Sequence, residues 1–527
     1  MRRRQLEVVG EAGRLVHDSL AFASFSFLLR FACFIMKHLP RLLLAVCLAS
    51  APAFLPAADA AKKKNADRPV AVGPAIGENK ATPVSRIKAK PGFAVELIYS
   101  VPGQEQGSWV NLCADDRGRI YASDQYGGLY RFTPPPPGQT VARSAVERMP
   151  ADIRAINGMA FAFGALYVGV NDYENIIKSG VYRITDSDGD DRLDKVELLR
   201  EITARGDHGV HAIVPAPDGK SLFLISGNGA KPTQLAPTSP VPRFWGEDHL
   251  LPRMPDGRGF MRDVLAPGGI IYRFTPDGKT FEAYASGFRN IFDAAFNRDG
   301  ELFTYDADME YDFNTSWYRP TRINHVVSGA EFGWRNGAGK RPEFYADNLG
   351  AVINVGPGSP TGVTFGYGAK FPVKYQRALF ALDWSWGKLY AVHLTPDGAS
   401  YKATKEEFIS GTPLPLTDAI IHPKDGALYF AIGGRRVQSG VYRVTYTGPE
   451  STAPDAEKPA PSPASAWILR SGSMPAWPTR CHGVSSATTR EILPRRAKTR
   501  LPWQRDETFG QAEDVSSWTF VDDGPPR

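Results

Sequence analysis

Short apolar runs separated by turn residues recur along most of this chain. In residues 207–228, Ile213 and Val214 form one run, residues 222–225 form the next, and Asp218-Gly219 lies between them. Because a tight hairpin turn needs positive φ, an Asp-Gly pair between two runs of β-forming residues predicts a β-hairpin. His208 and His211 are expected just before its first strand.

The hairpin belongs to a longer repeat in which an apolar strand, a glycine and a strand ending in Tyr follow one another. The repeated Tyr falls at positions 130, 182, 272, 390 and 442, so the steps are 52, 90, 118 and 52 residues. A unit near 52 residues fits four short strands, the size of a propeller blade. The 90-residue step then holds one blade and an insertion at about 229–267. The 118-residue step holds two blades, the hidden one near 321–326.

This count predicts an all-β, six-bladed β-propeller over residues 89–447. An open array of β-sandwiches is the alternative, and it is less favoured because the repeats continue over so much of the chain. The inner turns are expected at Arg117-Gly118, Asp218-Gly219, Asp299-Gly300 and Asp425-Gly426.

The ends of the chain have a different character. Residues 36–60 have the charged start, the apolar centre and the A-x-A site of a signal peptide, with Ala58-Asp59-Ala60 as the cleavage site. We therefore expect translation from Met36, residues 1–35 to be an upstream extension, and a periplasmic or secreted product. Residues 61–88 are interpreted as a linker, and residues 448–527 as a Pro-rich linker followed by a disordered tail.

Two other interpretations of the N-terminal region are open. The apolar patch at 20–35 resembles a membrane anchor, but Arg30 interrupts it and it is short for a span. Cys47 suggests a lipoprotein, although Val46 is a poor residue before an acylated Cys. The predicted mature chain has no transmembrane span.

Composition narrows the function classes. The 527 residues include 43 Pro and 51 Gly, as many turns require, and a net charge of +6 without a basic aromatic stripe argues against a nucleic-acid partner. Of the four cysteines, only Cys113 and Cys481 follow the predicted signal peptide, so no disulfide framework is expected. Cys113 is predicted to be buried in a strand. The chain contains no C-x-x-C-H motif, and we therefore predict no attached haem c.

The candidate catalytic residues are expected on loops that lead into strands. A loop histidine such as His208 is a reasonable general base because imidazole titrates near neutral pH, although a turn histidine that only bonds to backbone is the alternative. Arg289 can stabilise developing negative charge, and Asn290 offers both a donor and an acceptor.

These motifs resemble those of the soluble pyrroloquinoline-quinone (PQQ) glucose and sorbosone dehydrogenases. That family has a catalytic histidine ten residues before the Asp of a Pro-Asp turn, and His208 takes this place. The segments 286–293, 329–334 and 359–365 are similar to its G-x-R-N, G-x-x-Y-G-W and P-S-G-L-x-F motifs, in the same order. The resemblance implies that His208 and Arg289 are catalytic and that Asn290 lines the quinone site. His211 falls where the family usually has glycine, and it could narrow the pocket or act as a second base.

The quinone is a tricarboxylate and needs cations. Lys370, Arg435 and Arg436 lie on loops that could supply them. In the family, a Gly-Pro pair holds a calcium ion beside the quinone, but residues 305–312 of this chain have four carboxylates and no Gly-Pro. Asp306 and Asp308 could replace those carbonyl ligands. The loop could equally bind something else or be a solvated acidic turn.

A second calcium candidate lies at residues 186–197. Its oxygen ligands fall at loop positions 1, 3, 5, 9 and 12, as in an EF-hand, although Asp191 stands where that loop has glycine. Because strands are expected on both sides, we predict a structural calcium site with five ligands: Asp186, Asp188, Asp190, Asp194 and Glu197.

Residues 85–447 also resemble a bacterial family of membrane-bound dehydrogenase domains that are usually fused to a cytochrome c domain. The fused parts are missing from this sequence, so the resemblance implies an external electron acceptor such as a cytochrome c. The function expected is a secreted quinone-dependent oxidoreductase acting on a sugar or related alcohol. The alternatives are a non-enzymatic, calcium-stabilised propeller that binds carbohydrate or a protein, and a calcium-dependent lactonase.

Overall fold

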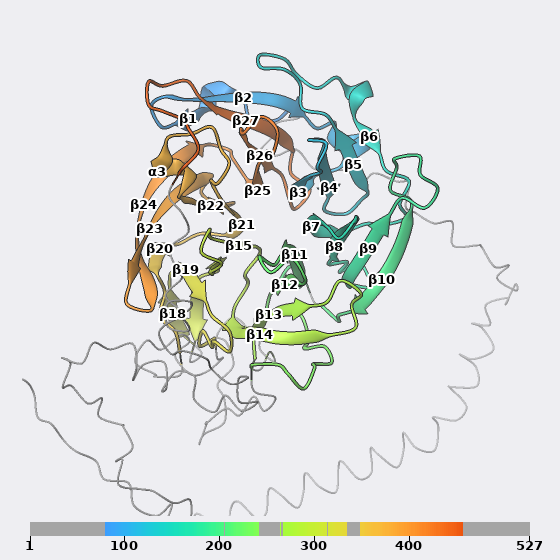
Figure 1. Cartoon of the computed structure of the whole chain (residues 1–527), viewed down its shortest axis with the longest axis vertical. Coiled ribbons are helices and arrows are strands. Elements are labelled where there is room, and N and C mark those ends of the chain that lie inside the picture. The colour runs from blue at the N-terminus through green and yellow to red at the C-terminus, as the bar shows by residue number, and fades with distance from the viewer. Residues whose placement is uncertain are drawn as a thin grey trace, which may run out of the picture. The chain divides into compact units, whose positions relative to one another are not determined.

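The computed structural model describes residues 80–204, 206–241, 264, 267–312, 315–334 and 348–456. These residues form six antiparallel sheets arranged as blades around a central axis, together with one separate hairpin (Figure 1). The chain is therefore a six-bladed β-propeller, as the repeat predicted. The expected signal peptide and most of the expected tail lie outside the described residues, and these expectations stay predictions.

The first three blades follow the chain in order, each running outward from its first strand. Blade 1 contains β3 (Trp109–Ala114), β4 (Ile120–Asp124), β5 (Leu129–Phe132) and β6 (Glu147–Arg148). Blade 2 contains β7 (Ile156–Ala162), β8 (Ala165–Val170), β9 (Gly180–Thr185) and β10 (Lys195–Glu201). Blade 3 contains β11 (Val210–Pro215), β12 (Leu222–Ser226), β13 (Gly269–Phe274) and β14 (Phe281–Phe288).

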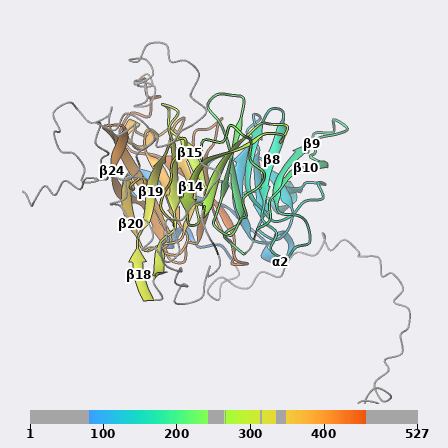
Figure 2. The ribbon, with the colours of Figure 1, turned by 90° about the horizontal axis from the view of Figure 1, so that it is seen from below.

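Blade 4 contains β15 (Ala294–Phe296), β16 (Leu302–Asp306), β19 (Thr321–Val326) and β20 (Ile353–Gly356). This is the hidden blade that the 118-residue step predicted. Between β16 and β19 the chain forms the hairpin of β17 (Met309–Asp312) and β18 (Thr315–Arg319), which extends beyond the edge of the blades (Figure 2).

The last two blades are completed by the start of the folded region. Blade 5 contains β21 (Pro360–Phe365), β22 (Leu379–Asp383), β23 (Lys388–Asp397) and β24 (Ser400–Gly411), and β1 (Ile87–Ala89) pairs with β24. Blade 6 contains β25 (Leu416–Ile421), β26 (Leu428–Ile432) and β27 (Gly440–Tyr446), and β2 (Phe93–Ser100) pairs with β27. Because strands from both ends share these sheets, the ring is closed by backbone hydrogen bonds.

Two short helices, α2 (Gly103–Gln106) and α3 (Val373–Gln376), and two 3₁₀ turns, Val84–Arg86 and Arg143–Ala145, complete the described elements. No helix in the described ranges has the length and apolarity that a membrane crossing requires.

The repeat has a structural reason. Each repeated Tyr lies in the third strand of its blade and is buried. In the inner turns, Gly118, Gly219, Gly300 and Gly426 all have φ between 62° and 84°, the conformation that favours glycine. Cys113 is buried in β3, as expected.

Both predicted boundaries of the propeller need correction. Residues 84–89 belong to the fold and not to a linker, because β1 completes blade 5 and Ala81 and Thr82 are buried. At the other end, the Asp455 carboxylate pairs with Arg298 of blade 4 and Arg377 of blade 5. The linker interpretation missed both segments because they lack an apolar run.

Candidate functional site

A cavity of about 650 Å³ opens on one face of the propeller. Its walls are the loops that enter the first strand of a blade and those that join the second strand to the third, including residues of all six blades. We call this the cavity face. Loops that join the first strand to the second leave from the other end of the strands and therefore form the opposite face.

The floor of the cavity is built by irregularities in the innermost strands. The pairing register shifts near the start of five of them, and the residues left out of the pairing include Val110, Asn157, His211, Thr361 and Thr417. All five line the cavity. A bulge turns the extra residue out of the regular alternation of a strand. The repeated bulge thus directs one side chain from each of these blades toward the cavity.

His208 lies in the wall just before β11 and is 5% exposed. Its Nδ1 is 2.7 Å from Asn228 Oδ1. An amide oxygen only accepts hydrogen bonds, so this contact places the proton on Nδ1 and leaves Nε2 as the basic nitrogen. Burial, the neighbouring Arg289 and His211 lower the pKa of His208 to about 3, against the opposing effects of Asn228 and Asp207. The imidazole is neutral at physiological pH.

His211 lies within β11, not before it as expected, and is 1% exposed. Its Nε2 is 3.1 Å from Asn290 Oδ1, and its ring packs against Phe292 with centroids 4.7 Å apart. Burial lowers the pKa of His211 to about 4. Its Nδ1 is buried without a hydrogen-bond partner. His211 therefore supports Asn290 and narrows the cavity, and its basic nitrogen is closed to solvent.

Asp306 fixes the position of Arg289 and Asn290. Its carboxylate, at the end of β16, accepts the backbone N–H groups of Arg289 at 3.1 Å and Asn290 at 2.9 Å. Asn228 N–H donates to the carbonyl of Arg289 at 2.8 Å, which links this loop to the next blade. The guanidinium of Arg289 contacts Glu310 at 3.2 Å. Asp306, expected as a calcium ligand, thus already accepts hydrogen bonds from the loop that carries Arg289.

Asn228 is the functional residue that sequence reasoning missed. In three other blades, an Asp that ends the second strand accepts backbone N–H groups from the segment before the first strand: Asp124, Asp306 and Asp383. In blade 3 the second strand ends in Ser226, and Asn228, two residues further on, bonds to the imidazole of His208. Because Asn228 lies outside the repeated Asp position, the repeat gives no signal that marks it.

The three candidate cations lie in different places. Arg435 lines the cavity and contacts the indole of Trp384. It also pairs with Asp207, which lies in a loop on the other side of the propeller. Arg436 does not line the cavity, and it pairs with Glu174 at 2.8 Å. Lys370 lies in the loop between β21 and β22 and therefore on the opposite face. Lys370 is thus separated from Arg435, whereas Arg436 shares the loop of Arg435, and anion binding by these cations stays a prediction.

The cavity wall in the described residues contains two guanidinium groups and three carboxylates. Arg289 pairs with Glu310, and Arg435 pairs with Asp207. Asp308, the third carboxylate, is 9% exposed and lies 3.5 Å from the backbone nitrogen of Gly358. Burial favours the neutral form of Asp207, but the paired guanidinium of Arg435 holds the pKa of this carboxyl below its usual value.

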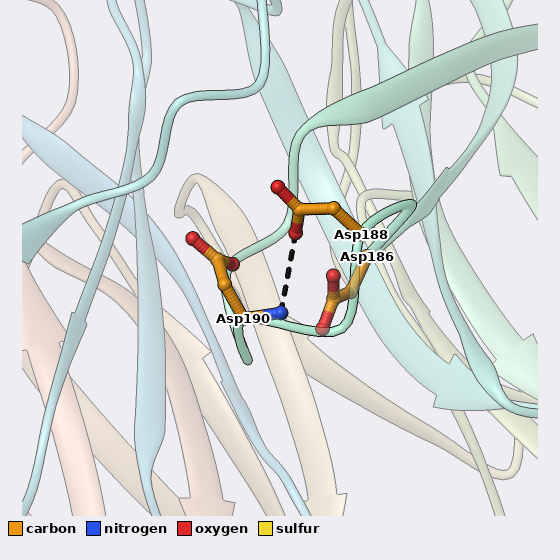
Figure 3. Close-up of side chains that lie close together, drawn as sticks. All are labelled: Asp186, Asp188 and Asp190. Carbon is orange, nitrogen blue, oxygen red and sulfur yellow. Dashed lines mark hydrogen bonds between the residues drawn. The ribbon is translucent and has the colours of Figure 1, made fainter.

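The predicted calcium loop joins β9 to β10 on the opposite face. The carboxylates of Asp186, Asp188 and Asp190 have ligand oxygens within 4.8 Å of one another, the one such group of three in the described ranges (Figure 3). Asp191 has φ of 68°, so it makes the sharp turn that glycine makes in an EF-hand. Asp194 instead accepts from Ser187, and Glu197 pairs with Arg183 at 2.5 Å. Three of the five predicted ligands are brought together and two are not.

The solved structures that resemble this chain include sugar dehydrogenases. A candidate glucose dehydrogenase from Thermus thermophilus has 17% identity over 67% of this chain and 100% of its own, with a TM-score of 0.48. The PQQ-bound aldose sugar dehydrogenase of Streptomyces coelicolor has 14% identity over 68% and 100%, with a TM-score of 0.45. The apo-form aldose sugar dehydrogenase of Escherichia coli has 15% identity over 67% and 99%, with a TM-score of 0.47. No family model and no curated protein matches the sequence.

Proposed function

We propose that the cavity binds a sugar or a related alcohol and that His208 accepts a proton from one of its hydroxyl groups. The observation that carries this proposal is the neutral, buried imidazole, whose Nδ1 is bound to Asn228 beside the guanidinium of Arg289. The lone pair of the neutral imidazole can take the proton, and the nearby guanidinium favours this transfer to a weakly basic ring by stabilising the alkoxide that results.

The lining supports a polyhydroxylated ligand. Asn157, Asn171, Asn290, Ser359, Ser385 and Thr361 offer neutral donors and acceptors. Orienting hydrogen bonds of this kind, in a cavity of this size, are typical of small-molecule sites. Oxidation of the alcohol also needs a hydride acceptor, and an external cytochrome c would then take up the electrons.

A quinone that bears three carboxylates is the acceptor that the sequence suggests, and when bound it would accept the hydride. The described cavity residues do not fit this group by themselves. Both of their cations are already paired with carboxylates, and a third carboxylate faces the same space. A divalent cation such as calcium near Asp308 would be needed to reverse the local charge.

Two other functions of the same cavity remain proposals. A non-enzymatic propeller would bind carbohydrate or a protein partner without turnover, and a calcium-dependent lactonase would hydrolyse an ester without an electron acceptor. The fold alone does not choose among them. We also propose that residues 36–60 direct the protein to the periplasm or outside the cell.

The test is a titration of the purified protein with PQQ and Ca²⁺, followed by dye-linked oxidation of a sugar panel, in wild type and His208→Ala. We expect sugar binding in both proteins and turnover only in the wild type. If sugars bind but are not oxidised under any of these conditions, the protein is a non-enzymatic propeller that binds carbohydrate. Hydrolysis of a lactone with calcium and no acceptor would identify the lactonase instead.

The loop of Figure 3 is proposed as a structural calcium site with Asp186, Asp188 and Asp190 as ligands. Calcium is expected to raise the melting temperature of the wild type, and Asp188→Asn is expected to remove that response. An equal response in both proteins would place the ion elsewhere.

A further inference from the structure

We propose that Trp386 is a stacking platform for one ring of a neutral saccharide at the mouth of the cavity. This inference rests on the proposed function and adds the class of ligand, namely an uncharged sugar that presents an apolar ring face. Trp386 lies in the turn between β22 and β23, and it is 56% exposed although it lines the cavity.

The first reason for this proposal is that a large aromatic side chain is exposed beside a cavity. Water-exposed tryptophan at a concave site is typical of a binding surface, since covering the ring removes apolar area from water. The C–H groups on one face of a pyranose ring form an apolar surface of similar extent. Stacking on an indole buries both surfaces and leaves the sugar hydroxyls at the edges of the ring.

The turn that carries Trp386 is held rigidly, which a platform requires. The buried carboxylate of Asp383 accepts the backbone N–H groups of Ser385 at 3.0 Å and Trp386 at 3.2 Å. It also accepts that of Ser359 at 3.1 Å, which joins the turn to the strand entry of the same blade. On its other side, Trp384 donates from Nε1 to the carbonyl of Gly433 at 2.6 Å. Little conformational freedom of the backbone would be lost on binding.

The wall next to Trp386 is polar and, among the described residues of this blade that line the cavity, uncharged. Ser359 Oγ and Ser385 Oγ are 2.6 Å apart, and Thr361 lies on the floor below them. These hydroxyl groups can both donate to and accept from sugar hydroxyls. The guanidinium of Arg435 lies over the ring of Trp384, but it is already paired with Asp207, so the chemistry favours a neutral sugar over a carboxylate.

The experiment measures binding to the full chain by saturation-transfer NMR and by tryptophan fluorescence, without quinone. The probes are glucose, maltose, cellobiose and glucuronate. We expect at least one neutral sugar to bind more tightly than glucuronate. Trp386→Ala should lower the binding affinity for that sugar at least tenfold. Trp386→Phe should lower the affinity less, because it keeps an aromatic face.

The matched control is Trp317→Ala. Trp317 is also exposed, at 39%, but it lies in β18 and does not line the cavity, so this variant should bind as the wild type does. Sugar binding that is equal in Trp386→Ala and wild type would overturn the platform and leave the proposed function standing. If neither protein binds any of the sugars, both the platform and the proposed function fail. Preferred binding of glucuronate would contradict the neutral class of ligand.

Discussion

Single residues around His208 decide what chemistry the cavity can perform. The imidazole is held neutral by burial, and its tautomer is set by one amide, that of Asn228. An aspartate at position 228 would stabilise the imidazolium, and an imidazolium cannot accept a proton.

Asn228→Asp is therefore expected to raise the pKa of His208 by more than one pH unit from its value of about 3. The imidazole nitrogens can be followed by ¹⁵N NMR as the pH is changed. His422, which bonds to Gly118 on the opposite face, serves as the control, and its titration should be the same in both proteins. An unchanged titration of His208 would show that residue 228 does not set its protonation.

The two buried histidines also predict how stability depends on pH. Their pKa values in the folded protein are about 3 and about 4, below the value near 6.5 of an unfolded chain. Below pH 6.5 the unfolded state binds more protons, so the free energy of unfolding falls as the pH is lowered toward 4. The slope is up to about 1.4 kcal/mol per pH unit for each histidine.

Urea denaturation at pH 7, 6 and 5 measures this slope. The variant His211→Gln replaces one titrating ring by a neutral amide and should flatten it. A steeper slope in the variant than in the wild type would contradict the assignment of neutral, buried imidazoles.

At the scale of elements, the loop before β15 depends on a carboxylate from the strand beside it. Asp306 accepts backbone N–H groups of both Arg289 and Asn290, so Arg289, the proposed alkoxide-stabilising residue, is positioned through its backbone. Gly227, which follows β12, packs against the same loop, because a Cβ added there would lie 2.3 Å from Asn290 Oδ1. The loop and the strand end are therefore packed without spare room.

Asp306→Asn is expected to lower the free energy of unfolding by about 1–3 kcal/mol, because buried N–H groups lose a charged acceptor. Sugar turnover should fall as well, since Arg289 moves with its backbone. Glu310→Gln is the matched control, because the exposed side chain of Glu310 contacts the guanidinium of Arg289, at 3.2 Å, and not its backbone. Stability is measured by urea denaturation, and equal losses in both variants would argue against a positioning role for Asp306.

At the scale of the whole molecule, closure of the ring depends on segments outside the repeats. β1 and β2 complete blades 5 and 6, and the segment around Asp455 joins blade 4 to blade 5. Ring closure couples the blades into one cooperative unit, so the loss of a closing segment is expected to affect all of them.

Truncations test the closure. A chain of residues 80–456 is expected to melt at the same temperature as the full chain. Removing residues 448–456 deletes the Asp455 carboxylate, whose side chain is 3% exposed, and should lower the melting temperature by several degrees. A chain that begins at residue 91 lacks β1, and its melting temperature should be lower as well. Equal melting of the 80–456 and 91–447 chains would show that neither segment contributes to the closure.

The amino-acid sequence predicts the six blades, because a repeated Tyr and repeated Asp-Gly turns are local features that follow from strand and turn chemistry. It also singled out His208, His211, Arg289 and Asn290, which the structure places together in one cavity. It did not identify Asn228, and it could not separate Lys370 from Arg435, because the face on which a loop lies depends on its place in the blade. Arg436 shares a loop with Arg435, but its guanidinium pairs with Glu174. The tertiary structure alone decided these points, together with the neutral state of the histidines and the position of Trp386. Burial, charge pairing and cavity walls arise from residues far apart in the chain, and only the closed ring brings them into contact.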